Sequence, residues 1–454
     1  MSFDVNLNFI MIFLLTIFLI FFSLVNFIIS KLDLLNPAFI FCSIFAVFSS
    51  SCLFVHLFTG LFEIENLLTL FILLIGPIIF TCLNLILAIT TPSHTNQKPT
   101  FNSHILDFNL LFKFILFVTQ LFFSFGMYKY VCDFASVYGV QGTFSEKLAF
   151  YDLITKFSTD VRLRMPPYVA VGNVFSRAIC YILIYSFVLK FCFKRKFDLL
   201  VFLIIALNAA TSLMSNGRTE VLRIVTTVVF MSAFFEMLKN STIKFKLGLI
   251  FKFIFIAVFT VLSLSLLRDL LGRETYDFFK VIFGYMGAPI KNLDFYLSQP
   301  WASDNRIFGT MTFQKFWNWI GLKLDLSELV YTPVLPFIYF DNFRMGNVYT
   351  TYYPYYYYDF GITGCIVILS IMSLYYLVTY YKLKGCLNFD LSKINIQIIL
   401  YFYLLNDLLM SPFGARFTDT IVNVNFFRFM IFLLFFSCCF NKLRFRLFKA
   451  CITK

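Results

Sequence analysis

The sequence predicts an all-α polytopic membrane protein, and three observations support this class. First, 60% of the 454 residues are hydrophobic and only 13% are charged, with a mean hydropathy of +0.83. A soluble core cannot enclose that much apolar surface. Second, apolar runs of about 20 residues, the length that crosses a bilayer, recur along the chain. Third, basic residues concentrate in alternate loops, as the positive-inside rule requires.

The apolar runs predict about 11 membrane-spanning helices within a single integral membrane domain, residues 1–454. The first run has no basic residues before it and is longer than a signal-peptide core, so we interpret it as a span. The expected spans lie at about 7–30, 37–59, 66–91, 110–132, 173–191, 198–215, 219–238, 247–267, 356–379, 395–411 and 421–438.

Lysines and arginines near the ends of the spans predict an outer N-terminus and a cytoplasmic C-terminus. Two outer loops then stand out. The smaller, 133–172, includes the segment 161–168, whose sequence Val-Arg-Leu-Arg-Met-Pro-Pro-Tyr is compatible with a short surface helix. The larger, about 268–355, is the longest interval without a spanning run, and it is rich in charged and aromatic residues. We therefore expect recognition or chemistry in the larger loop.

Charge and cysteine content exclude several other readings. The net charge of +13 would suggest a nucleic-acid partner in a soluble protein, but here it is explained by lysines facing an anionic inner leaflet. The two outer loops contain no cysteine, so no disulfide framework is expected there. No Cys or His spacing typical of a metal site occurs, and we expect neither metal nor cofactor.

Arginine is distributed differently from lysine. In the predicted topology 16 of 23 lysines are cytoplasmic, whereas 11 of 14 arginines lie outside or in the outer part of a span. Arginine binds phosphate oxygens two at a time through its planar guanidinium, so the bias predicts a phosphate or pyrophosphate ligand. Pairing with outer carboxylates or lipid headgroups is the alternative. The outer arginines are Arg162, Arg164, Arg177, Arg218, Arg223, Arg268, Arg273, Arg306, Arg344, Arg416 and Arg428.

Three of these arginines fall inside expected spans: Arg177, Arg223 and Arg428. A charge at such a depth is costly unless it is paired or faces a polar cavity. Snorkelling to the headgroups would account for Arg177 and Arg223, but less well for Arg428, which lies among phenylalanines. All three are expected near the outer headgroup level, where a lipid-linked phosphate would also lie.

The first local motif is the segment 214–223, Met-Ser-Asn-Gly-Arg-Thr-Glu-Val-Leu-Arg. Gly217 permits a tight turn between two spans. Arg218 then begins the seventh span, where the helix N-terminus adds positive potential. Glu220 and Arg223 are three residues apart, so they are predicted to pair on one helix face. A plain hairpin with a snorkelling arginine is the alternative.

The second motif, at 355–364, is Tyr-Tyr-Tyr-Tyr-Asp-Phe-Gly-Ile-Thr-Gly. Interfacial tyrosines are typical of an aromatic belt, but Tyr357 and Tyr358 could also stack on sugar rings. Asp359 lies at the expected membrane edge beside the large loop. Gly361 and Gly364 are predicted to allow close helix packing.

With these two motifs, the strongly hydrophobic chain and the large outer loop, the sequence resembles the Wzy-type O-antigen polymerases, which are related in fold to the O-antigen ligases. The resemblance extends over the whole topology, but the motifs cover only 214–223 and 355–364. It implies a glycosyltransferase of the bacterial inner membrane, in which the outer N-terminus predicted from the basic residues would lie in the periplasm. Such an enzyme joins oligosaccharide repeat units carried on undecaprenyl pyrophosphate into O-antigen or a related surface polysaccharide. A chain-length regulator is a possible protein partner, and no nucleic acid is expected.

The expected chemistry assigns roles to residues. A sugar bonded to pyrophosphate is already activated, so the enzyme must stabilise the departing pyrophosphate and deprotonate an acceptor hydroxyl. The substrate-binding candidates are Arg177, Arg218, Arg223, Arg268, Arg273, Arg344, Arg416, Arg428, Tyr357 and Tyr358. The candidate bases, which the sequence does not rank, are Glu220, Asp269, Glu274, Asp277 and Asp359.

Two related functions and a non-enzymatic role are the alternatives. A ligase is expected, by the same resemblance, to carry a histidine in the large outer loop, and none occurs between 268 and 355. A flippase for the lipid-linked unit is the main alternative of a different class, although no inverted repeat or midplane charge cluster supports it. A channel or scaffold ranks third, because the chain has no pore ring or heptad pattern.

Overall fold

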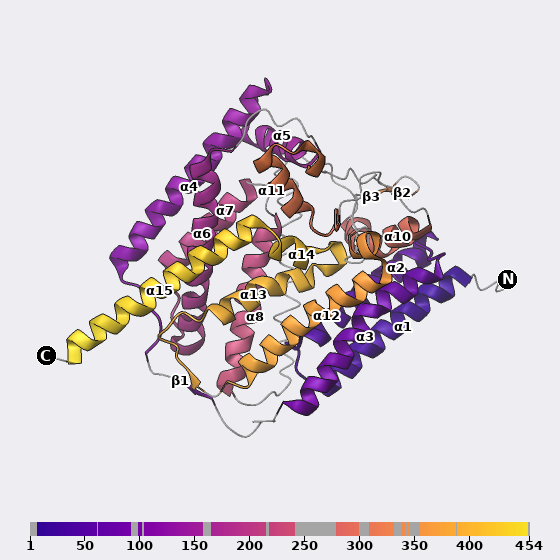
Figure 1. The fold of residues 1–454 in the computed structure, drawn as a ribbon, viewed down its shortest axis with the longest axis horizontal. Coiled ribbons are helices and arrows are strands. Elements are labelled where there is room, and N and C mark those ends of the chain that lie inside the picture. Colours follow the sequence, from indigo (N-terminus) through magenta and orange to yellow (C-terminus); the bar gives the residue numbers. More distant parts are fainter. Residues whose placement is uncertain are drawn as a thin grey trace. The chain divides into compact units, whose positions relative to one another are not determined.

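The structure is a computed structural model of the 454-residue chain. It describes residues 7–60, 62–91, 99–101, 104–157, 165–214, 218–240, 278–298, 308–330, 338–340, 343–345, 355–386 and 388–452. Within these ranges the fold is almost entirely helical (Figure 1). The helices, including short 3₁₀ and π segments labelled η, are α1 (Leu7–Ile29), α2 (Pro37–Thr59), α3 (Leu67–Thr90), α4 (Leu110–Val137), α5 (Phe144–Phe157), α6 (Pro167–Leu189), η1 (Lys190–Lys194), α7 (Leu199–Met214), α8 (Arg218–Asn240), α10 (Phe278–Ser298), α11 (Gln314–Leu324), η2 (Ser327–Leu329), α12 (Tyr357–Lys384), α13 (Ile396–Leu409), η4 (Ser411–Phe413), α14 (Arg416–Ile421) and α15 (Val424–Ile452).

Eight helices of the described residues are long and apolar enough to cross a membrane: α1, α2, α3, α4, α6, α8, α12 and α15. Two further predicted spans coincide with the shorter apolar helices α7 and α13. The predicted span 247–267 lies outside the described residues. The all-α polytopic membrane class is therefore confirmed, and eight of the eleven predicted spans are helices of spanning length.

Asparagine side chains determine where several of these helices begin. Asn36 accepts hydrogen bonds from Ala38 N at 2.9 Å and Phe39 N at 3.3 Å, and so caps α2. Asn66 caps α3 through Leu68 N, and Asn109 caps α4 through Phe112 N. Each side chain satisfies a backbone N–H that has no partner within the helix. This is the local reason why the predicted and observed starts of these three spans agree within one residue.

The chain divides into two compact units, each assembled from separate stretches of sequence. The first unit comprises 1–94, 275–385 and 407–424, and the second comprises 95–274, 386–406 and 425–454. Each unit also contains a two-stranded sheet. In the first, β2 (Ile338–Phe340) pairs antiparallel with β3 (Phe343–Met345). In the second, β1 (Thr100–Phe101) pairs in parallel with β4 (Asn388–Phe389).

In the first unit, α1, α2 and α3 pack together, and α12 packs against α3 (Figure 1). A buried aspartate, Asp33, joins two of these segments. Its carboxylate accepts hydrogen bonds from Tyr380 Oη and, at 2.6 Å, from Lys384 Nζ of α12. A buried charge is tolerated when it is both paired and hydrogen-bonded. This pair therefore ties the turn after α1 to the last turns of α12.

The large predicted outer loop contains α10, which is buried against α2 and α3. At Gly287 a Cβ atom would lie 2.9 Å from the Cα of Cys52, so only glycine allows this approach of the two helices. Asp294, 1% exposed, accepts hydrogen bonds from the backbone N–H groups of Glu65 and Asn66 and from Lys291. The α10 portion of the loop therefore belongs to the helical core of the first unit.

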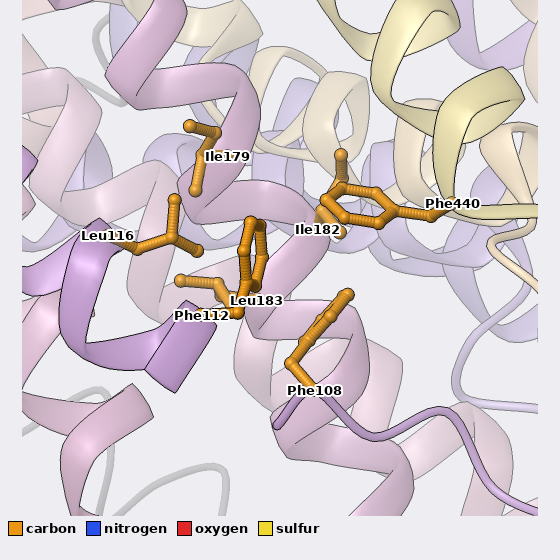
Figure 2. A pocket seen from close by; sticks show the side chains of 7 residues that line it. All are labelled: Phe108, Phe112, Leu116, Ile179, Ile182, Leu183 and Phe440. Atoms are coloured by element: carbon orange, nitrogen blue, oxygen red, sulfur yellow. The ribbon is translucent and has the colours of Figure 1, made fainter. Parts of the chain in front are cut away.

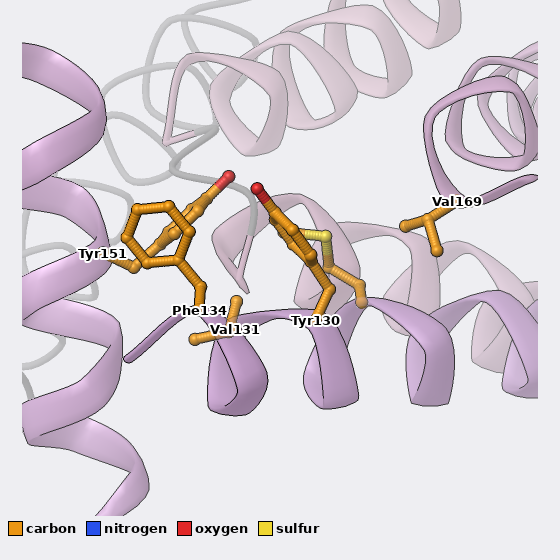
Figure 3. Close-up of a cluster of buried hydrophobic side chains, with 6 residues drawn as sticks. Tyr130, Val131, Phe134, Tyr151 and Val169 are labelled. Carbon is orange, nitrogen blue, oxygen red and sulfur yellow. The ribbon is translucent and has the colours of Figure 1, made fainter. Parts of the chain in front are cut away.

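In the second unit, the segment after α4 folds back as a helix. Tyr151 of α5 packs edge-on against Tyr130 and Phe134 of α4, and Val131 and Val169 complete the cluster (Figure 3). The smaller outer loop is therefore not irregular. Its helix, α5, lies at 144–157. Of the segment 161–168, for which the sequence allows a surface helix, residues 161–164 lie outside the described residues and residues 167–168 begin α6.

A small apolar pocket and an ion network lie elsewhere in this unit. The pocket is lined only by apolar side chains, from α4, α6, α15 and Phe108, which lies two residues before α4 (Figure 2). In the network, Lys190 Nζ and Lys113 Nζ each lie 2.7 Å from Asp198 Oδ2. Asp107 also pairs with both lysines, so two lysines and two aspartates give this network balanced charge.

The orientation of the helices can be tested with reporter fusions. Fusions after about Lys196, Lys244 and Lys384 should report the cytoplasm, and fusions near Asn216, Asp304 and Ala415 should report the outside. Alkaline phosphatase and a cytoplasm-active reporter at each position provide the paired measurement. A cytoplasmic reading at Asp304 would contradict the predicted topology.

Candidate functional site

A buried charged cluster joins α6 and α8 of the second unit. Glu220 accepts a hydrogen bond from Tyr181 Oη at 3.0 Å and another from Arg223 Nη1 at 2.9 Å. Arg177 Nε lies 3.4 Å from Glu220 Oε1. The spacings i, i+4 on α6 and i, i+3 on α8 place each pair of residues on one helix face. The predicted Glu220–Arg223 pair is confirmed, and Arg177 joins it.

Aromatic side chains of α13 and α15 complete the cluster. The guanidinium carbon of Arg223 lies 4.5 Å from the ring centroid of Tyr403, and its Nη1 donates a hydrogen bond to Tyr403 Oη at 3.2 Å. The ring of Phe429 stacks on that of Tyr403 with their centroids 4.6 Å apart. The ring of Tyr181 contacts that of Tyr403 edge-on, at a centroid distance of 4.8 Å. A cation–π contact stabilises a guanidinium most when water is excluded. Arg223 is therefore held in one orientation by both charge and ring.

The cluster brings three charged groups together, the guanidinium groups of Arg177 and Arg223 and the carboxylate of Glu220. The side chains of Glu220 and Arg223 are 5% and 9% exposed, whereas that of Arg177 is 27% exposed. Buried charges are tolerated when they are paired and hydrogen-bonded. Of the three charged side chains, that of Arg177 is the most exposed to a ligand.

The other predicted residues of this unit lie close to the cluster in sequence. Arg218 is the first residue of α8, two positions before Glu220, and its side chain is outside the description. Arg428 lies on α15 beside Phe429 and donates a hydrogen bond to Asn425 Oδ1 at 3.4 Å. Arg428 is only partly buried, and it bonds to a side chain three positions before it on the same helix. The structure therefore does not require a partner for Arg428 deep in the membrane.

In the first unit, Asp359 organises part of the large loop. Its carboxylate accepts hydrogen bonds from Thr312 N at 2.6 Å and from Met311 N at 3.2 Å. Phe360 packs against Phe308, with ring centroids 5.0 Å apart. Two backbone N–H donors satisfy much of the hydrogen-bonding capacity of a carboxylate. In this geometry Asp359 positions the loop segment at 311–312. Its role as a base stays a prediction.

The tyrosine run is divided between core and surface. Tyr356 is fully buried, and its Oη lies 3.3 Å from Thr418 Oγ1, whereas Tyr357 and Tyr358 are partly exposed. At Gly361 the backbone has φ +63° and α12 is kinked. This positive φ explains why glycine occupies position 361. The predicted reason, close helix packing, is wrong for Gly361, because no atom lies within 4 Å of a Cβ added there.

The remaining predicted residues are placed only in part. Arg416 begins α14, and its backbone N–H donates to Gly414 O at 2.8 Å. Arg344 lies in β3 opposite Tyr339, and its side chain is outside the description. Five further predicted residues lie outside the described residues, so their roles stay predictions: Arg268, Asp269, Arg273, Glu274 and Asp277.

The sequence missed two residues of the cluster, Tyr181 and Tyr403. Tyr181 could have been found, because it lies one helical turn after Arg177 on the same face. Tyr403 carries no local signal, since its partner Arg223 is 180 residues away. Within the described ranges, no group of three His, Cys, Asp or Glu residues is arranged to hold a metal ion.

Comparisons with known proteins add no constraint on this arrangement. No family model, no curated protein and no solved structure matches the chain.

Proposed function

We propose that this protein is a glycosyltransferase that polymerises oligosaccharide repeat units carried on undecaprenyl pyrophosphate, at the periplasmic face of a bacterial inner membrane. The observation that carries the proposal is the Arg177–Glu220–Arg223 cluster. It places two arginine guanidinium groups around one carboxylate between two membrane-spanning helices, α6 and α8. The resemblance of the segments 214–223 and 355–364 to the O-antigen polymerases supports the same function.

The proposed reaction needs cationic groups of this kind. When the bond between the sugar and pyrophosphate breaks, negative charge develops on the departing oxygen, and fixed cationic donors lower the barrier. Arg177 contacts Glu220 Oε1 through Nε at 3.4 Å, and we propose that the two terminal nitrogens of its planar guanidinium form the fork that binds the pyrophosphate. Arg218, at the N-terminus of α8, adds a second cation beside the positive end of the helix dipole.

The contacts of Glu220 favour a positioning role over that of a base. Tyr181, Arg177 and Arg223 all stabilise its carboxylate form. A general base must reach the proton that it removes, and this carboxylate already faces three donors. We therefore propose that the acceptor hydroxyl is deprotonated by an acidic residue of the large loop, Asp269 or Glu274, with Asp359 as the third candidate.

Deletion of the gene in the source bacterium tests the proposed function. Loss of polymerisation should remove long polysaccharide chains and leave a single repeat unit on the lipopolysaccharide core, and the wild-type gene should restore the ladder. Loss of every unit would instead indicate a flippase or a ligase, and would contradict the proposal. Accumulated lipid-linked units on the outer leaflet would distinguish the ligase from the flippase.

The aromatic run gives a separate prediction. Replacing Tyr357 and Tyr358 together with alanine should shorten the polymer at unchanged protein level, because stacking surface for sugar rings is lost. The matched control is the double phenylalanine variant, which keeps both rings and should retain normal length on a polysaccharide gel. Normal chain length in the alanine variant would assign both residues to the aromatic belt.

A further inference from the structure

We propose that α11 is an interfacial helix that binds the lipid headgroup layer on the side of the bilayer where α12 begins. The surface in question consists of the exposed apolar side chains of α11 and of the turn that follows it. This inference is independent of the proposed glycosyl transfer, because it depends only on the geometry of the first unit.

The helix is amphipathic and exposes its apolar face. Trp319 and Leu322 are three residues apart, which places them on the same face, and they are 39% and 58% exposed. Lys315, four residues before Trp319, and Lys323 are exposed beside them. A face of tryptophan and leucine flanked by lysine is typical of helices that lie in a membrane interface.

The turn after α11 extends this surface. Asp325 adopts φ +53°, and the chain folds back so that Leu326 N donates to Gly321 O at 2.9 Å. A Cβ at Gly321 would lie 2.8 Å from Leu326 O, so the glycine permits the closure. Leu324 and Leu326 remain 64% and 46% exposed. The residues 314–330 thus form a closed helix–turn motif with leucines on its outside.

Three contacts hold the start of α11 at the level where α12 begins. The carboxylate of Asp359, the third residue of α12, accepts hydrogen bonds from Met311 N and Thr312 N. Phe313 packs on Phe360 at 6.2 Å. Lys315 Nζ lies 3.2 Å from Asp419 Oδ2 of α14. The start of α11 is therefore attached beside the first turn of a spanning helix.

The length of α11 decides between two orientations. Its 11 residues extend about 16 Å, so a helix pointing away from the bilayer would carry Leu322 and Leu324 far into water. A helix lying along the interface places the same side chains among acyl chains, which the hydrophobic effect favours. The leucines favour lipid over a sugar ligand, because sugar rings stack on aromatic faces such as Trp319 and leave leucine side chains without a role.

Tryptophan fluorescence in proteoliposomes tests the proposal. The chain has three tryptophans, Trp301, Trp317 and Trp319, so the full-length variant Trp301→Phe/Trp317→Phe reports Trp319 alone. In vesicles of phosphatidylcholine brominated at upper acyl carbons, its emission should be blue-shifted and lose most of its intensity. Aqueous iodide should quench it little, and bromines deep in the acyl chain should quench it less than shallow ones, as expected for an interfacial depth.

A second measurement leaves Trp317 in place, because its Nε1 donates to Phe308 O and the double variant removes that bond. In the otherwise native protein, the single change Trp319→Phe should abolish most of the shallow bromolipid quenching that the native protein shows. Strong iodide quenching of Trp319 with no bromolipid quenching would overturn the proposal and assign this face to the aqueous phase or to a glycan. Unchanged bromolipid quenching in Trp319→Phe would also overturn it.

Discussion

The variant Arg218→Lys is expected to reduce polymerisation by about 100- to 1,000-fold, the effect of losing one transition-state donor, or about 3–4 kcal/mol. Arg218 is the first residue of α8, two positions before Glu220. Lysine preserves the charge and the helix start, so folding and topology should survive. It cannot offer the planar pair of donors that fits two pyrophosphate oxygens. On a gel, long chains should collapse to single repeat units at equal protein abundance.

The control is Arg195→Lys, at the other end of the second unit's helices. Arg195 is 66% exposed and contacts Glu236 at 3.4 Å, a pair whose contribution is small. This variant should leave chain length unchanged. Wild-type chain length in Arg218→Lys would mean that Arg218 is only an interfacial anchor and that pyrophosphate is bound elsewhere.

Replacing Glu220 with glutamine should destabilise the folded protein by about 3–5 kcal/mol, the cost of leaving a buried charge without its partner. The substitution leaves two guanidinium groups, Arg177 and Arg223, with no carboxylate between them. It also weakens the bond that Glu220 accepts from Tyr181. Thermal unfolding of the purified protein in detergent micelles measures the loss, and the membrane abundance of the variant should fall in parallel.

The double variant Glu220→Gln/Arg223→Gln distinguishes charge from shape. It removes one of the two guanidinium groups that Glu220→Gln leaves without their shared carboxylate, so it should recover part of the stability that Glu220→Gln loses, and the two substitutions should be strongly non-additive. The variant Glu236→Gln, at the exposed pair with Arg195, should cost about 1 kcal/mol or less. A Glu220→Gln protein with native stability and no activity would show instead that Glu220 is the catalytic base.

The membrane class and most of the spans could be predicted because both depend on local properties. An apolar run of about 20 residues satisfies the bilayer wherever it packs, and backbone hydrogen bonds in lipid must be made within the helix. The predicted starts of α2, α3 and α4 agree with the structure for a similar reason, since an asparagine caps each helix from the adjacent position in sequence. The Glu220–Arg223 pair is equally local, because i, i+3 spacing alone places the two residues together.

What only the tertiary structure decided are the contacts between segments distant in sequence. The sequence alone could not show that Arg177 shares the carboxylate of Glu220, or that Tyr403 lies beneath Arg223. Nor could it show that Asp359 receives two backbone N–H groups from the loop 47 and 48 residues before it. Hydropathy and spacing specify which residues enter the membrane, but not which helix faces meet. That choice depends on side-chain packing and on the pairing of buried charges, and both are established only when the helices assemble.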